Sequence, residues 1–353
     1  MKNFLNSYLL FPTALIFLFS QFAHAEVVTT KGEKAGKVSV LDHVKAMPGK
    51  FSYIAPYSGW VVEIDLNGEV LNSFRIPSKY LRHLGGGADI EWVASLKEFL
   101  ITAPRMGVFR TSINGNITWS CDSEFISHDA DYQDDGSVFF VNGWDDIGKN
   151  EPIFTWMGQD CSIIDELRSN DIELREERLH RDEADKSHLH TNAVQRIRPK
   201  LIMLSLRNYD EIVLVSLKKR KIVRRYYKAT HVHDPTPVDA NVKPKQMEFY
   251  YADRSKGDRL MLSRSKPKRK KPITIWNSAK HEPEWKRGDD YKNRLWSPLR
   301  TLELLPNGNF LVSGSAYLGQ VTPEGELVWE VRLKGFENQF EHKDWVYKAS
   351  FRE

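Results

Sequence analysis

The chain has 353 residues, of which 41% are hydrophobic, and a formal net charge of +4. This length is too great for one small core and suits a domain of a few hundred residues built from repeats. The nearly neutral charge gives no support to nucleic-acid binding, and we expect no nucleic-acid partner.

The first residues have the pattern of a secretory signal peptide, predicted over residues 1–25. Lys2 supplies positive charge, residues 9–19 are almost wholly apolar, and a small-x-small cleavage site ends at Ala25. The apolar stretch is short for a membrane span. We therefore predict cleavage after Ala25, export to the periplasm, and no stable membrane insertion after cleavage.

A repeating pattern follows the predicted leader. Residues 26–50 form a polar lead-in, and residues 51–353 are predicted to form one domain of repeated strand pairs. Asn-Gly between alternating apolar residues indicates a hairpin, because both positions tolerate positive φ. Such outer pairs occur at 59–70, 106–119 and 319–329, with a weaker copy at 211–223.

Each repeat also has an inner pair of strands. The inner pairs are at 89–102, 128–142, 190–207, 233–254 and 300–313. Repeats start roughly every 40 to 65 residues, which is typical of four-stranded propeller blades. C-terminal material around 345–351 is expected to complete the blade of the first hairpin and close the ring. We predict an all-β fold, a six-bladed β-propeller of four-stranded antiparallel blades, with five or seven blades as alternatives.

Two charged segments interrupt the pattern. Residues 165–188 are dense in charge of both signs and are predicted to be an exposed insertion. A basic loop is predicted at about 264–272, and solubility is its simplest explanation. The alternative is attraction of an anionic polymer or a membrane surface.

Three histidines stand where inner strands begin: His128, His190 and His233. The first strand of each propeller blade lines the central channel, so equivalent positions should form a ring at one mouth. Counting back from the turns places Arg300 and Asp89 at the position of His128. Histidine can donate, accept or attack near neutral pH, so this ring is a candidate active site.

The second inner strand runs antiparallel and returns to the same mouth. The residues at those strand ends are Arg105, Asn142, Arg207 and Arg254. Guanidinium groups bind sulfate or phosphate oxygens through paired, charge-assisted hydrogen bonds. A neutral imidazole can attack sulfur or phosphorus, and a second imidazole can protonate the departing oxygen. The pattern indicates a site for an oxyanion ester, with Arg105, Asn142, Arg254 and Arg300 as substrate-binding residues.

Two other interpretations of the histidine motifs compete with an active site. The His-Asp motifs could simply cap strands, which we would favour for one histidine alone. Three histidines in register with arginines favour a functional anion site. A zinc or copper site is the third interpretation, but the arginines would repel a cation. We predict no metal and no cofactor.

Four segments together resemble the bacterial arylsulfate sulfotransferases. They are His128-Asp129-Ala130-Asp131-Tyr132, His190-Thr191-Asn192, Ser205-Leu206-Arg207-Asn208 and His233-Asp234-Pro235. The resemblance covers about 53–351. It implies a six-bladed propeller in the periplasm that transfers a sulfuryl group from a phenolic sulfate ester to another phenol. The implied route is ping-pong through a sulfated histidine, without a nucleotide sulfate donor.

The resemblance also implies roles for individual residues. His233 matches the family's nucleophile, and His128 matches a histidine of the substrate pocket. His190 and Asn192 match an H-x-N motif, in which His190 would serve in acid–base chemistry or sulfuryl stabilisation. Arg207 matches the arginine that holds the sulfuryl oxygens.

The chain departs from the family in several places. Residues 26–50 are too few for the extra N-terminal β-sandwich of well-studied members, and Ala193 replaces a common serine. The family's disulfide near the nucleophile is absent, because Cys121 and Cys161 lie far upstream. Export permits a disulfide between these two cysteines, but the sequence does not show their geometry. The acceptor is therefore open, either a phenol or a glycan hydroxyl. The competing hypothesis is a non-catalytic propeller that binds an anionic glycan or scaffolds an envelope polysaccharide complex.

Overall fold

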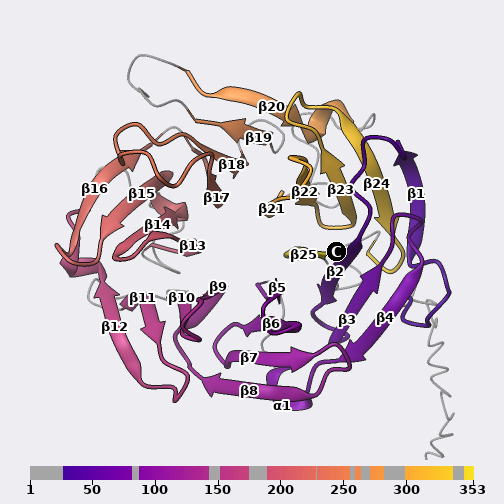
Figure 1. Cartoon of the computed structure of the whole chain (residues 1–353), viewed down its shortest axis with the longest axis horizontal. Coiled ribbons are helices and arrows are strands. Elements are labelled where there is room, and N and C mark those ends of the chain that lie inside the picture. The colour runs from indigo at the N-terminus through magenta and orange to yellow at the C-terminus, as the bar shows by residue number, and fades with distance from the viewer. Residues whose placement is uncertain are drawn as a thin grey trace, which may run out of the picture.

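The strands form six antiparallel sheets arranged as blades around a central axis (Figure 1). A computed structural model of the chain describes residues 27–81, 87–142, 152–174, 189–227, 229–254, 259–263, 271–281, 299–336 and 346–353. The prediction of an all-β, six-bladed β-propeller with four-stranded blades is confirmed. In the described part of the chain, no helix is long and apolar enough to cross a membrane.

Each blade runs from an innermost strand at the channel to an outer strand at the rim (Figure 1). Blade 1 contains β25 (Ala349–Arg352), β2 (Lys50–Ala55), β3 (Trp60–Ile64) and β4 (Val70–Arg75). Blade 2 contains β5 (Asp89–Val93), β6 (Glu98–Ala103), β7 (Gly107–Ser112) and β8 (Ile117–Asp122). Blade 3 contains β9 (Ile126–Tyr132), β10 (Val138–Asn142), β11 (Pro152–Met157) and β12 (Ile163–Arg168).

The remaining blades follow the same order. Blade 4 contains β13 (Thr191–Arg198), β14 (Leu201–Leu206), β15 (Glu211–Ser216) and β16 (Lys221–Tyr226). Blade 5 contains β17 (His233–Pro237), β18 (Phe249–Asp253), β19 (Arg259–Leu262) and β20 (Ile273–Asn277). Blade 6 contains β21 (Thr301–Leu304), β22 (Phe310–Ser313), β23 (Tyr317–Val321) and β24 (Leu327–Leu333). The short helices are α1 (Ser78–Leu81), η1 (Ser169–Asp171), η3 (Arg207–Tyr209) and η4 (Ser278–Lys280).

The two ends of the described chain close the ring together. The last strand, β25, pairs antiparallel with β2 and becomes the innermost strand of blade 1, as the sequence pattern predicted. The predicted lead-in over 26–50 is more than a connector, because β1 (Gly36–Leu41) pairs with β24 as a fifth strand of blade 6. Chain segments from opposite ends therefore join blades 6 and 1.

The predicted strand pairs correspond to observed hairpins. Gly68 and Gly115 have φ of 71° and 81° at the turns of the first two outer pairs, which is the conformation that the Asn-Gly signal requires. The outer hairpins β11–β12 and β19–β20 were not predicted. The charged insertion predicted over 165–188 was wrong at its start, because 163–168 is strand β12 and 169–171 is η1.

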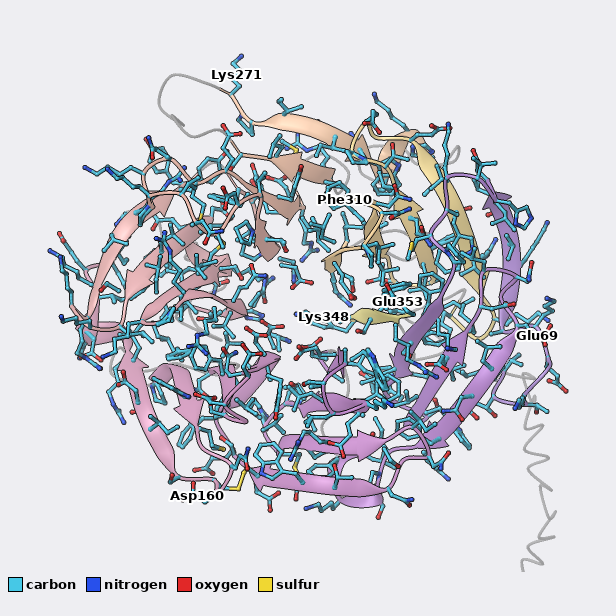
Figure 2. The ribbon with its side chains drawn as sticks, viewed as in Figure 1. Glu69, Asp160, Lys271, Phe310, Lys348 and Glu353 are labelled. Atoms are coloured by element: carbon cyan, nitrogen blue, oxygen red, sulfur yellow. A yellow bond between two sulfur atoms is a disulfide. The ribbon has the colours of Figure 1, made fainter. Side chains whose placement is uncertain are left out.

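Some predicted segments lie outside the described residues. They are the signal peptide, residues 175–188 of the charged insertion, and residues 264–270 of the basic loop. Lys271, at the edge of that loop, is exposed at the rim of the molecule (Figure 2).

The hydrophobic core is divided among the blade interfaces. Buried apolar residues form a cluster between each pair of neighbouring blades, for example Phe51 of blade 1 against Trp329 of blade 6, with ring centroids 4.4 Å apart. Both faces of a blade are covered, so many strands carry consecutive buried residues, as Leu201–Leu206 does. Each fully buried large side chain contributes roughly 1.5–3 kcal/mol of transfer free energy.

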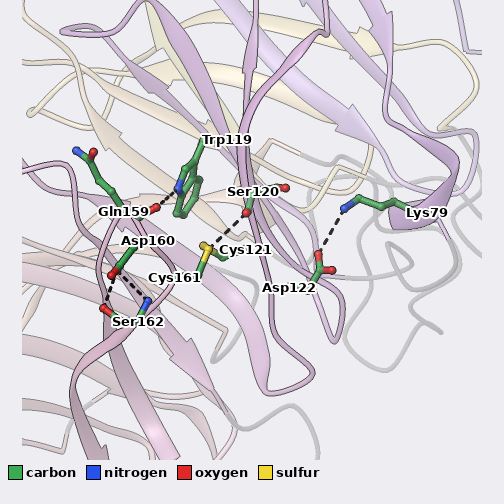
Figure 3. The surroundings of a disulfide bond; sticks show 9 residues. All are labelled: Lys79, Trp119, Ser120, Cys121, Asp122, Gln159, Asp160, Cys161 and Ser162. Atoms are coloured by element: carbon green, nitrogen blue, oxygen red, sulfur yellow. Dashed lines mark hydrogen bonds and ion pairs between the residues drawn. A yellow bond between two sulfur atoms is a disulfide. The ribbon is translucent and has the colours of Figure 1, made fainter.

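A disulfide links two neighbouring blades (Figure 3). Cys121 on β8 and Cys161 in the β11–β12 turn are bonded, with their Cα atoms 5.6 Å apart. Trp119 Nε1 donates to Gln159 O at 2.7 Å beside it, and Asp160 Oδ1 accepts from Ser162 N at 3.1 Å within the same turn. The disulfide that the sequence left open is therefore present between blades 2 and 3.

Side-chain hydrogen bonds join the innermost strands around the channel. Asp89 Oδ2 accepts from Ala130 N of the next blade at 3.4 Å, and Asp129 Oδ2 accepts from Val194 N at 2.6 Å. Asp234 Oδ2 accepts from Leu302 N at 3.2 Å in the same way. These bonds satisfy edge N–H groups that have no further strand to pair with. They also fix the register of each innermost strand against the next.

Candidate functional site

The inter-blade register assigns residues to rings that encircle the channel. The ring at the mouth of the channel, here called the mouth ring, contains one residue from the start of each innermost strand: Ala88, His128, Asn192, His233, Arg300 and Tyr347. The ring below it, the lysine ring, contains Asp89, Asp129, Ala193, Asp234, Thr301 and Lys348, which all line one channel pocket of about 360 Å³. The prediction that Asp89 is equivalent to His128 was wrong by one residue.

Irregular strand pairing orients the side chains of the candidate site. The pairing register shifts beside His128 in β9, beside Asn192 in β13, and beside His233 in β17. The corresponding pairs β5–β6 and β21–β22 have no shift. A bulge inserts extra residues into one strand and redirects its side chains, and bulges are common next to active sites. The three irregular strands are those that bring imidazoles to the mouth.

His128, His190 and Arg207 form a hydrogen-bonded chain. Arg207 Nη1 lies 3.1 Å from His190 Nδ1, and His190 Nε2 lies 3.1 Å from His128 Nε2. Guanidinium can only donate, so His190 Nδ1 accepts and its proton is on Nε2. That proton is donated to His128 Nε2, which leaves the His128 proton on Nδ1. The arginine therefore fixes the tautomers of both histidines.

His190 precedes β13 and is not itself a member of the mouth ring. Its backbone has a φ of 49°, a left-handed conformation in which histidine is enriched among non-glycine residues. This turn lets the side chain reach His128, with ring centroids 5.0 Å apart. The mouth-ring position of blade 4 is occupied instead by Asn192.

Asn192 connects blade 4 to His233. Its Nδ2 donates to Val232 O at 3.0 Å and lies 3.3 Å from His233 Nε2. A carbonyl only accepts, so the amide orientation is fixed and His233 Nε2 accepts the second N–H. Within the described residues, Asn192 Oδ1 and His233 Nδ1 are buried and have no hydrogen-bond partner. The Nε2 lone pair of His233 therefore has the Asn192 amide as its donor.

Burial and positive charge keep the three imidazoles neutral. Burial lowers the pKa of His233 well below 6.5, and Arg300, Arg254 and Arg207 lower it further. Burial lowers the pKa of His128 as well, with His190 and Arg207 next in size. The pKa of His190 falls for the same main reason, helped by Arg207. A neutral imidazole is the form that can act as a nucleophile.

Tyr347, from the ring-closing segment, was missed by sequence reasoning. Its ring stacks on His128 with centroids 4.9 Å apart and meets His233 edge-on at 6.0 Å. Arg300 places its guanidinium 4.8 Å from the ring centroid. Ala88 stands between Tyr347 and His128 in the mouth ring, and its small side chain leaves room for this stack. The register of the closing strand is the signal that could have found Tyr347.

Lys348 lies directly below this site and points into the channel (Figure 2). It forms ion pairs with Asp129, with Asp234 at 2.9 Å and with Asp89 at 3.8 Å. Burial alone would lower the pKa of Lys348, but the three carboxylates outweigh it and keep the ammonium charged. Among the described residues, no His, Cys, Asp and Glu side chains are grouped to hold a metal ion.

The remaining predicted substrate residues lie in different surroundings. Arg254 acts electrostatically on His190 and His233. Arg105 lines a separate pocket with Lys79 and Asp122, among other residues. Asn142 is buried in blade 3, where its Nδ2 donates to Thr155 Oγ1 at 2.7 Å. The structure therefore brings together Arg207, Arg254 and Arg300 with the histidines, and places Arg105 and Asn142 beside other partners.

Comparisons with known proteins show the fold. No family model matches the sequence, and no curated protein matches it either. A solved structure of a protein of unknown function from Bacteroides caccae is similar, with a TM-score of 0.56 and 10% identity over 87% of this chain and 100% of that chain. The WD40 propeller domain of Doa1 has a TM-score of 0.49 and 11% identity over 86% of this chain and 85% of its own. TolB from Acinetobacter baumannii has a TM-score of 0.48 and 11% identity over 86% of this chain and 66% of its own.

Proposed function

We propose that this propeller transfers a sulfuryl group from an aryl sulfate ester to a hydroxyl acceptor through His233. The observation that carries the proposal is the convergence of three buried, neutral imidazoles with Arg207, Arg254 and Arg300 at one channel mouth. Arginine charge favours an anionic ester and stabilises the charge that develops on the transferring group. The resemblance of the histidine motifs to arylsulfate sulfotransferases supports the same reaction.

The first half-reaction forms a bond between His233 Nε2 and sulfur. The Nε2 lone pair attacks, the bond from sulfur to the aryl oxygen breaks, and that oxygen leaves with the electron pair. Asn192 Nδ2 lies 3.3 Å from His233 Nε2, and its N–H would turn to a sulfuryl oxygen as the new bond forms. Arg207 would hold another oxygen while orienting His190.

Proton transfer falls to the His190–His128 pair. The aryl group would leave as the phenolate and take its proton from solvent, because a neutral imidazole N–H is too weak an acid to supply one. In the second half-reaction, the acceptor hydroxyl would give its proton to the neutral pair as its oxygen attacks sulfur and the nitrogen–sulfur bond breaks, and the pair would then release that proton to solvent. The enzyme is thereby restored without a cofactor.

We further propose that the chain acts in the periplasm. The predicted leader ending at Ala25 supports export, and the Cys121–Cys161 disulfide fits an oxidising compartment. The acceptor would be a phenol or a glycan hydroxyl reached from the mouth of the channel.

Turnover of 4-nitrophenyl sulfate in the presence of a phenol tests the proposal. We expect phenol release that saturates with acceptor, and His233→Ala should abolish it. His281→Ala is the matched control, because this histidine stacks on Trp276 in blade 5 with centroids 5.2 Å apart and should leave turnover unchanged. If the chain binds a sulfated polysaccharide in a salt-sensitive way and shows no turnover, sulfuryl transfer is refuted and glycan binding is supported as the function.

A further inference from the structure

We propose that Tyr347 is a substrate-binding residue, whose hydroxyl donates a hydrogen bond to an anionic oxygen of the ester. This inference rests on the proposed function for the identity of the ester, while anion binding at Tyr347 can be measured by itself. It assigns a binding role to the chain segment that closes the propeller.

The placement of Tyr347 is the first argument. Its side chain is 4% exposed and touches both His128 and the proposed nucleophile His233. A substrate positioned for attack by His233 would therefore meet the Tyr347 ring. The ring is held from two sides, by the stack on His128 and by the Arg300 guanidinium. This support pre-organises the hydroxyl, as binding sites require.

The hydroxyl itself is the second argument. Within the described residues, Tyr347 OH is buried and has no hydrogen-bond partner. Asn192 Oδ1 and His233 Nδ1, in the same ring, are in the same situation. Buried polar groups in native proteins nearly always have partners, so each exception needs an explanation. A bound anionic oxygen would supply the partner that the Tyr347 hydroxyl lacks.

Charge selects the kind of ligand. Burial raises the pKa of Tyr347 above its usual 10, although Arg300 and Lys348 oppose the rise. The phenol therefore stays protonated at neutral pH and can donate. Arg300, 4.8 Å from the ring centroid, adds positive charge beside the donor. A neutral donor next to a guanidinium suits an anionic oxygen.

Calorimetric titration of the purified chain with inorganic sulfate, at constant ionic strength, tests the inference. We expect Tyr347→Phe to keep the melting temperature and to bind sulfate about tenfold more weakly, since one hydrogen bond to a charged group is lost. Tyr226→Phe is the matched control, because Tyr226 is equally buried but its hydroxyl faces Tyr251 OH at 3.4 Å. This control should bind sulfate like the wild type.

Each outcome decides between the two proposals. Unchanged sulfate affinity in Tyr347→Phe, or no sulfate binding by the wild type, overturns the role of Tyr347. Weaker binding in Tyr347→Phe without any ester turnover by the wild type keeps the anion site and removes sulfuryl transfer. Arg300→Gln is a second variant, and it should weaken sulfate binding as well, because it removes the charge beside the hydroxyl.

Discussion

At the scale of residues, hydrogen bonding determines the proton position on each imidazole of the mouth. Arg207 donates to His190, and His190 in turn donates to His128, so the chain has one direction. Asn192 donates to His233 from a separate side. The structure thus separates His128 and His190, which share a hydrogen bond, from His233, whose Nε2 accepts from Asn192. The same division follows from the motif resemblance, which assigns attack to His233.

The lowered histidine pKa values predict an unusual pH profile. Because the pKa of His233 lies well below 6.5, its neutral form persists as the pH falls through that value. The rate of ester cleavage, measured as kcat/KM, should stay flat there, whereas an exposed imidazole would lose half its activity at its pKa. A pH–rate profile with the midpoint of its acid limb at 6.5 would contradict the buried, neutral nucleophile.

Most residues of the candidate site were predictable from the sequence, but their exact positions along the channel axis were not. The motifs located the three histidines, Asn192 and Arg207, because residue types and strand starts are visible in the sequence. The turn after β5 explains why counting misplaced Asp89 by one residue: Leu96 N donates to Val93 O as Gly136 N donates to Gln133 O, so Leu96 and not Lys97 is the equivalent of Gly136. Tyr347 was missed because the closing strand has no hairpin partner adjacent in sequence from which to count.

At the scale of elements, the closing segment has two tasks. Its start supplies Tyr347 to the mouth ring, and the next residue supplies Lys348 to the lysine ring below. Lys348 pairs with carboxylates from β5, β9 and β17, so one ammonium joins three blades to β25. The Asp129 and Asp234 of the His-Asp motifs therefore have a structural function, while their histidines face the mouth.

Replacing Lys348 should show how strongly the stability of the fold depends on its ion pairs. Lys348→Met would leave the buried carboxylates of Asp89, Asp129 and Asp234 without their counter-ion, and we expect a loss of about 3–5 kcal/mol in the free energy of unfolding. Urea denaturation measures it. Lys45→Met is the control, because its pair with Glu326 is largely exposed and should contribute little. Equal stability of the two variants would refute the role of Lys348.

At the scale of the whole molecule, the fold was predictable because its pattern repeats. Alternating apolar residues and Asn-Gly turns recur along the chain, so errors in one blade did not change the architecture. Blades 3 and 5 were only half predicted, because their outer hairpins lack such turns. The part of 26–50 that forms β1 was missed, because a strand added at the rim of blade 6 has no counterpart in the other repeats.

The inter-blade disulfide should stabilise the ring as a whole. It closes a loop with a sequence separation of 40 residues. Constraining a loop of this length in the unfolded chain is worth about 4 kcal/mol in the chain-entropy description. The double variant Cys121→Ala/Cys161→Ala should therefore melt at a lower temperature than the wild type, and reductant should shift the wild type but not the variant. Identical melting curves would show that the bond contributes no stability.

The central claim is that His233 carries the sulfuryl group between two half-reactions. The direct measurement is mass spectrometry of the digested protein after incubation with 4-nitrophenyl sulfate and no acceptor. The account predicts a sulfuryl adduct on the peptide containing His233, which disappears when a phenol is added and is absent in His233→Ala. Phenol release without an adduct, or an adduct on His128 or His190 instead, would contradict it.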